Sequence, residues 1–100
     1  MQHMGLFDFL NPKKAEMFSG GSGEGFETAV VLNTRNGSAG VAAESQFITA
    51  QSGTRDKDWK KKEQALVSDK NKHYDVVTVE LSDGKTRVFH FDISQFYGRL

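Results

Sequence analysis

Apolar and polar residues alternate most regularly near the C-terminal end of the chain, in two runs that flank Asp83-Gly84. Strict alternation is typical of a half-buried β-strand, and an Asp-Gly pair between two such runs is a strong turn signal. We therefore predict a β-hairpin from Tyr74 to Ile93, folded back at Asp83-Gly84.

The register of this hairpin depends on the length of its loop. A loop of two residues, Asp83-Gly84, places Val77 opposite His90, whereas a loop that also includes Ser82 places Val77 opposite Phe89. We favour the three-residue loop, because it gathers the larger apolar set on one face. That set consists of Val77, Val79, Leu81, Phe89, Phe91 and Ile93. The two-residue loop remains the alternative, since it also leaves one mostly apolar face.

Residues 26–51 predict a strand followed by a helix. The segment 26–33 is rich in β-branched residues, which favour strands. Alanines between Ser38 and Gln51 favour a helix that Ser38 caps and Gly53 ends. Because Asn36-Gly37 is also a hairpin signal, a second strand over residues 39–51 is the alternative.

A second helix is expected over residues 59–67. Asp56 or Asp58 can cap it, and Trp59 and Leu66 would share one of its faces. Together these elements predict an α+β domain. Its small antiparallel sheet has about three strands, in the order strand, helix, helix, β-hairpin, with the helices packed on it.

The first 25 residues are expected to form a flexible N-terminal segment. Residues 1–3 have the character of an expression-tag remnant before a natural start at Met4. Asn11 and Pro12 favour a short helix through residue 18, and the Gly-rich stretch 20–25 is typical of a linker. We therefore divide the chain into this segment, residues 1–25, and a single domain, residues 26–100.

Composition limits the classes of function. The chain of 100 residues has no Cys, which excludes disulfides and thiolate metal sites and suits a reducing compartment. It has no apolar run long enough to span a bilayer and no secretory signal. Its formal net charge of zero removes the overall field that attracts nucleic acids or acidic membranes. We expect a cytoplasmic protein without a cofactor.

The hairpin also carries a cluster of metal-ligand residue types, His73, Asp75, His90 and Asp92. In the two-residue register these side chains share one face, where they can hold a divalent metal or form an acid-base site. In the favoured register His73 and Asp75 lie on one face, and His90 and Asp92 on the other. No nucleophile stands in a recognisable catalytic motif, so we do not expect an enzyme.

Two further segments suggest binding. Trp59 is followed by three lysines, which suggests weak nucleic-acid binding, but on a helix these lysines fan around the axis while Trp59 turns inward. Nucleic acid is therefore not the expected partner. The apolar residues between Leu6 and Leu10 are expected to pack on the domain or stay mobile, with docking on a partner or membrane as the alternative.

The leading hypothesis is a non-enzymatic interaction or binding module. In the favoured register the second face of the hairpin is too apolar for a purely solvated surface. The residues of that face are Tyr74, Val76, Thr78, Val88 and His90. We expect a protein partner or self-association there, with Tyr74, Val76, His90 and Asp92 as the binding residues.

Two short stretches carry a resemblance to bacterial proteins. The segment Met4-Gly-Leu-Phe-Asp-Phe-Leu10 resembles the openings of many small bacterial cytoplasmic proteins. Leu81-Ser-Asp-Gly-Lys85 with Phe91-Asp-Ile-Ser-Gln-Phe-Tyr-Gly98 is similar to the tail of an uncharacterised bacterial domain. The resemblance implies a bacterial, cytoplasmic origin and transfers no activity and no functional residue.

Overall fold

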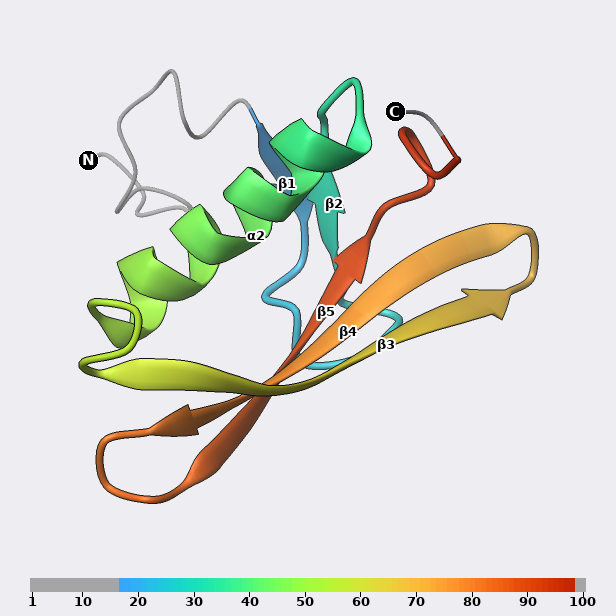
Figure 1. Cartoon of the computed structure of the whole chain (residues 1–100). Coiled ribbons are helices and arrows are strands. Elements are labelled where there is room, and N and C mark those ends of the chain that lie inside the picture. The colour runs from blue at the N-terminus through green and yellow to red at the C-terminus, as the bar shows by residue number, and fades with distance from the viewer. Residues whose placement is uncertain (1–16, 99–100) are drawn as a thin grey trace, which may run out of the picture.

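The computed structural model of the protein describes residues 17–98 (Figure 1). In this part of the chain one helix packs on a five-stranded sheet. The elements are, in chain order, β1 (Phe18–Gly20), β2 (Val30–Leu32), α2 (Gly37–Ser52), β3 (Trp59–Asp69), β4 (Lys72–Leu81) and β5 (Thr86–Asp92). Within residues 17–98 there is no helix of the length and apolar character needed to cross a membrane.

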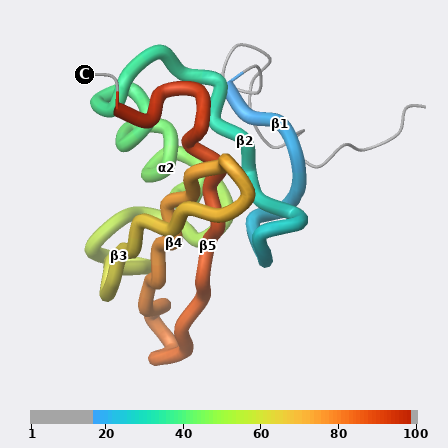
Figure 2. Tube along the Cα trace, turned by 90° about the vertical axis from the view of Figure 1, so that its right-hand side faces the viewer, coloured from blue at the N-terminus to red at the C-terminus, as the bar shows by residue number. Residues whose placement is uncertain are grey.

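The strands lie side by side in the order β1-β2-β5-β4-β3, which can be followed across Figure 2. Neighbours pair antiparallel except for β2 and β5, which run parallel through the pairs Val30–Phe91 and Val31–Asp92. The sheet is therefore mixed. The helix α2 lies in the connection between β2 and β3 and covers one face of the sheet (Figure 1).

The expected fold class was wrong in its details. A sheet of about three strands with two helices was expected, whereas residues 17–98 form a five-stranded mixed sheet with one helix. The class remains α+β. The added strands are β1, at one edge of the sheet, and β3, at the other.

The second expected helix, residues 59–67, is part of the strand β3. Lys, Glu, Gln and Ala are good helix formers, which is why the segment predicted a helix. Pairing with β4 along the whole length of β3 overrides this weak preference. The two strands are joined by Lys70 and Asn71, whose φ angles of 50° and 65° are those of a two-residue hairpin turn.

The first expected helix is confirmed as α2, and the alternative strand over residues 39–51 was wrong. Its cap is Asn36 instead of Ser38, because the Asn36 side chain accepts a hydrogen bond of 2.9 Å from the backbone N–H of Ala39. Gly53 ends the helix, as expected.

The C-terminal hairpin is confirmed in the three-residue register, since Val77 lies opposite Phe89 and Tyr74 opposite Asp92. The backbone N–H of Leu81 donates to the carbonyl of Lys85 across the loop, at 2.8 Å. Gly84 has a φ of 85°, a left-handed conformation that completes a three-residue loop of this kind.

The hydrophobic core lies between α2 and the face of the sheet that the three-residue register makes apolar. Phe47 of α2 is at its centre, with ring contacts to Phe18, Phe89 and Phe91 at centroid distances between 5.4 and 6.1 Å. Offset and edge-on aromatic pairs at such distances stabilise a core beyond simple area burial. The core also contains Val30, Leu32, Ala43, Ile48, Trp59, Val77, Val79, Ile93 and Phe96.

Most of the expected N-terminal helix, which ended at residue 18, lies outside the described residues, as do residues 1–10. Phe18 itself begins β1, which pairs with β2. The Gly-rich stretch 20–25 is joined to the domain by backbone hydrogen bonds, from Gly21 to Ala29 at 3.1 Å and from Gly23 to Thr28 at 2.7 Å.

Candidate functional site

The face of the sheet opposite α2 is called the open face below. It is formed by side chains that alternate with those of the core. The register places on it Ala65 and Val67 of β3, Tyr74, Val76 and Thr78 of β4, and Val88, His90 and Asp92 of β5. The four residues that the sequence indicated for binding, Tyr74, Val76, His90 and Asp92, therefore lie together on one face.

Phe26 lies on this open face, although a strand was expected at its position. The strand β2 begins only at Val30, and the preceding loop turns back over the sheet. The Phe26 ring contacts Tyr74 and His90 edge-on, at centroid distances of 5.0 and 4.8 Å. Phe26 itself is 42% exposed, whereas Tyr74 is buried at 7%, so the outer surface of this aromatic cluster is the Phe26 ring.

The loop is held in place through Gly23. Its carbonyl accepts a hydrogen bond of 2.7 Å from the backbone N–H of His90 and lies 2.9 Å from Nδ1 of the His90 ring. Gly23 has a φ of 89°, and a Cβ at this position would lie 3.1 Å from Cγ2 of Val30. Glycine is therefore required for the loop to approach β5 this closely.

A groove of about 670 Å³ extends from the aromatic cluster along one end of the sheet. Phe26 and Tyr74 supply its apolar part. The loop before β2 contributes Glu24 and Glu27, and the hairpin of β3 and β4 contributes Asp69, Lys70 and Lys72 at its turn end. The groove thus combines an aromatic surface with charges of both signs.

The four metal-ligand candidates do not converge. His73 and Asp75 lie on the core-facing side of β4, and His90 and Asp92 lie on the open face. Among residues 17–98 no three His, Cys, Asp or Glu side chains lie close enough together to hold a metal ion.

Each of the four has a partner in the protein. The His73 ring stacks on Tyr97 at 3.7 Å and lies 2.8 Å from Oγ of Ser68. Asp92 accepts a hydrogen bond of 2.9 Å from the backbone N–H of Ser94 and lies 3.8 Å from Nζ of Lys72.

Asp75 forms a buried carboxyl pair with Glu44 of α2. The sequence indicated Asp75 as a candidate ligand but did not indicate Glu44. Burial, and then the hydrogen bond and charge of Asp75, raise the pKa of Glu44 from 4.5 to about 9, while Lys61 lowers it. Glu44 is therefore protonated at neutral pH and donates to Asp75. The second partner of Asp75 is Gln64, whose Nε2 donates to Oδ2 at 2.6 Å.

The carboxyl pair is poorly placed for catalysis. Glu44 borders a cavity of about 80 Å³ that also touches Val41, Ile48 and Val77. A space of this size admits a few water molecules, whereas ligand sites usually exceed about 300 Å³. The arrangement supports a structural role for the pair, linking α2 to β4.

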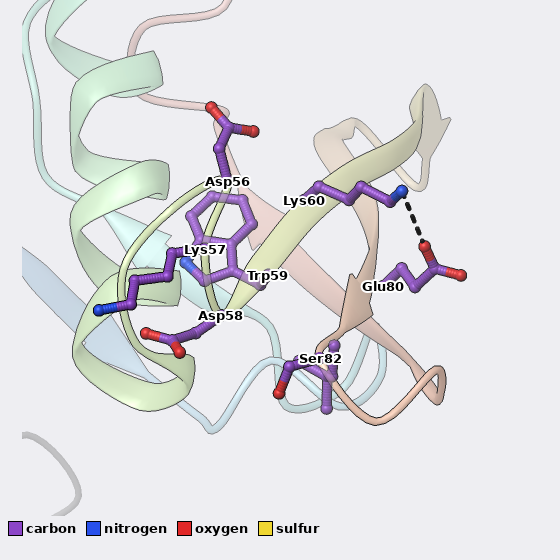
Figure 3. Close-up of a pocket in the computed structure, with 8 residues that line it drawn as sticks. Asp56, Lys57, Asp58, Trp59, Lys60, Glu80 and Ser82 are labelled. Carbon is purple, nitrogen blue, oxygen red and sulfur yellow. Dashed lines mark ion pairs between the residues drawn. The ribbon is translucent and has the colours of Figure 1, made fainter.

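The Trp59 region forms a second, open pocket of about 270 Å³ at the start of β3 (Figure 3). Trp59 is buried, and its Nε1 donates a hydrogen bond of 2.8 Å to the carbonyl of Gly53. Lys60 points toward Glu80, with its Nζ 3.2 Å from Oε1. The ring is therefore not free to stack on a base, and the adjacent cation is already paired.

Two parts of the site were missed at the level of the sequence. Phe26 was placed in a strand, although the Gly-rich stretch before it allows the chain to turn back. Glu44 was not indicated as a site, although it is the one carboxyl in the segment 38–51 that was expected to form a helix. A lone carboxyl in such a helix is the available signal, and it does not reveal Asp75 as the partner.

Comparison with known proteins does not assign a family. No family model matches the chain, and neither a curated protein nor a solved structure is significantly similar to it.

Proposed function

We propose that this protein is a non-enzymatic interaction module and that its open face binds a protein partner. The observation that carries the proposal is the exposure of apolar side chains opposite α2. Val88 is 40% exposed and Phe26 is 42% exposed, beside the partly buried Val76 and His90. A contiguous surface of this kind is typical of a binding site.

The groove beside Phe26 and Tyr74 suggests the chemistry of the partner. Aromatic side chains are frequent anchors of protein interfaces, because they bury a large area and lose few rotamers. Glu24 and Glu27 on one side and Lys70 and Lys72 on the other favour a polypeptide with an apolar side chain flanked by opposite charges.

The test is an affinity capture with three forms of the protein as bait: wild type, Val88→Lys and Ala42→Lys. Val88 lies on the open face, and Ala42 is exposed on α2, at the opposite side of the sheet. A partner retained by wild type and by Ala42→Lys should be lost with Val88→Lys. Its purified form should bind Val88→Lys at least about tenfold more weakly, because the substitution places a charge in an apolar contact.

Equal retention by Val88→Lys and wild type would place the contact elsewhere and overturn the proposal. Loss with Ala42→Lys alone would move the site to the helix.

A further inference from the structure

The strand β3 is an edge of the sheet in the described part of the chain, and it is long. It pairs with β4 on one side only, over residues 59–69. Most of its side chains are exposed, including Leu66 at 56%. The outer edge of such a strand offers unpaired N–H and C=O groups to another strand, and proteins usually protect edges of this kind.

The first part of the β3 edge is protected. The backbone N–H of Asp56 donates a hydrogen bond of 2.6 Å to the carbonyl of Trp59, so the preceding loop covers the beginning of the strand. Lysines follow at Lys60, Lys61 and Lys62, and the register with β4 shifts between Lys61 and Glu63, which marks a bulge. Charged residues and bulges are the usual means of blocking an edge, and after Glu63, which borders the bulge, none follows before Asp69.

The alternation of backbone hydrogen bonds along the sheet shows which residues in the unprotected part of β3 direct their N–H and C=O groups to the free edge. In an antiparallel ladder, both backbone groups of a residue face the same neighbour. Ile93 donates to the carbonyl of His73, at 2.9 Å, so the odd-numbered residues of β4 face β5. The even-numbered residues face β3, and they lie opposite Ala65 and Val67. The remaining backbone groups on β3, those of Gln64, Leu66 and Ser68, therefore point to the free edge.

We propose that two copies of this chain associate by antiparallel pairing of their β3 edges, centred on Leu66. Leu66 then lies opposite Leu66 of the second copy, and Gln64 lies opposite Ser68 in both directions. Every one of these residues has its backbone groups directed outward, so the hydrogen bonds of the two edges match.

The side chains fit the same register. Leu66 meets Leu66, and Ala65 meets Val67, so each apolar residue of this stretch finds an apolar neighbour on the same face. Centring the pair on Ala65 also satisfies the hydrogen bonds, but it places Leu66 opposite Gln64. The charges of Glu63 and Asp69 meet at the ends of the pairing, where both are exposed. Their repulsion predicts a weak dimer that strengthens with salt.

The proposed dimer does not depend on the proposed binding of a partner at the open face, because the two contacts use different parts of the sheet. A two-fold axis perpendicular to the sheet makes the sheets of the two copies continuous. The two open faces then lie side by side on one surface. Because Leu66 lies at the edge and Val88 on the open face, the two contacts are separable by mutation.

The decisive measurement is amide hydrogen exchange by NMR over a concentration series from about 10 μM to about 1 mM, the range expected for a small interface. The amides of Gln64, Leu66 and Ser68 should exchange more slowly as the concentration rises. The amides of Ala65 and Val67 should be protected at every concentration, since they bond to β4. Concentration-independent exchange of the three outward amides would overturn the proposal.

Sedimentation velocity on variants provides the second test. Leu66→Pro removes an outward N–H without removing a bond to β4, and Leu66→Lys places two cations opposite each other. Both should sediment as monomers at about 1 mM, whereas Val88→Lys should associate like wild type. If Leu66→Pro unfolds, Leu66→Lys alone decides. Association that survives Leu66→Lys but is lost with Val88→Lys would mean that the copies meet through their open faces, and it would refute edge pairing.

Discussion

Glu44 shows how a single buried residue links two elements. Its carboxyl is carried by α2, on the face that packs on the sheet, and its partner Asp75 is on β4. Two carboxylates cannot both remain ionised in such a place, so one of them keeps a proton and becomes a hydrogen-bond donor. The raised pKa of Glu44 makes folding take up a proton at neutral pH.

The stability of the protein should therefore fall as the pH rises. The pKa of Glu44 is 4.5 when unfolded and about 9 when folded, so folding takes up a proton between these values. The stabilising contribution of the protonated carboxyl is therefore fully present below pH 4.5 and is lost as the pH rises toward 9. The slope is at most about 1.4 kcal/mol per pH unit. Glu44→Gln should remove this slope. Its free energy of unfolding should exceed that of wild type by on the order of 2 kcal/mol at about pH 8. Urea unfolding at several pH values measures both effects.

Glu63→Gln is the matched control, because Glu63 is an exposed carboxyl on β3. It should keep the slope of wild type. Since the remaining ionisable groups are common to all three proteins, only a difference between variants reports on Glu44. Identical slopes for wild type and Glu44→Gln between about pH 5 and 8.5 would contradict a protonated Glu44.

At the scale of elements, β3 is the main departure from the prediction. Its composition favours a helix, but its neighbour β4 offers a ladder of backbone hydrogen bonds along the strand, with one register shift between Lys61 and Glu63. The turn at Lys70 and Asn71 makes this pairing possible, since both residues take left-handed backbone angles. Asn adopts this conformation readily, whereas Lys does so at a cost of about 1 kcal/mol.

The turn can be improved. The double substitution Lys70→Asn with Asn71→Gly creates the preferred Asn-Gly pair and should stabilise the protein by about 1 kcal/mol. Thermal and urea unfolding measure the change. Lys85→Asn is the control, because Lys85 has no left-handed angle to relieve and should leave stability nearly unchanged. A loss of stability in the double variant would argue against a two-residue turn between β3 and β4.

For the whole molecule, the important asymmetry is between the two faces of the sheet. One face packs on α2 around Phe47, and the other carries Val88 and Phe26 partly exposed to solvent. The fold therefore covers one face with α2 and leaves part of the second face exposed. The second face is available for binding, which is the basis of the proposed function.

A pair of valines on neighbouring strands tests this asymmetry. Val79 is fully buried on the core face, so Val79→Ala should lower the free energy of unfolding by about 2–3 kcal/mol. Val88 is on the open face, and Val88→Ala should change it by no more than about 0.5 kcal/mol. Urea denaturation compares the two. Similar losses for both variants would show that the open face is also part of the stabilising core.

The open face and the Glu44–Asp75 carboxyl pair differ in how far the sequence could predict them. Once the three-residue loop was preferred, the sequence placed Tyr74 and His90 on a common face, because a strand alternates its side chains strictly. It could not place Glu44 beside Asp75, which are 31 residues apart in the chain. Nothing local to either residue indicates the other.

The sequence by itself determined the elements that depend on short-range signals. The Asp83-Gly84 turn, the alternation on each side of it and the small residues of α2 act within a few residues, and the hairpin register and this helix follow from them. Only the tertiary structure decided that residues 59–69 form a strand, that β2 runs parallel to β5, and that Phe26 turns onto the open face. These features depend on hydrogen bonds and packing between distant segments, which outweigh the small conformational preferences of single residues.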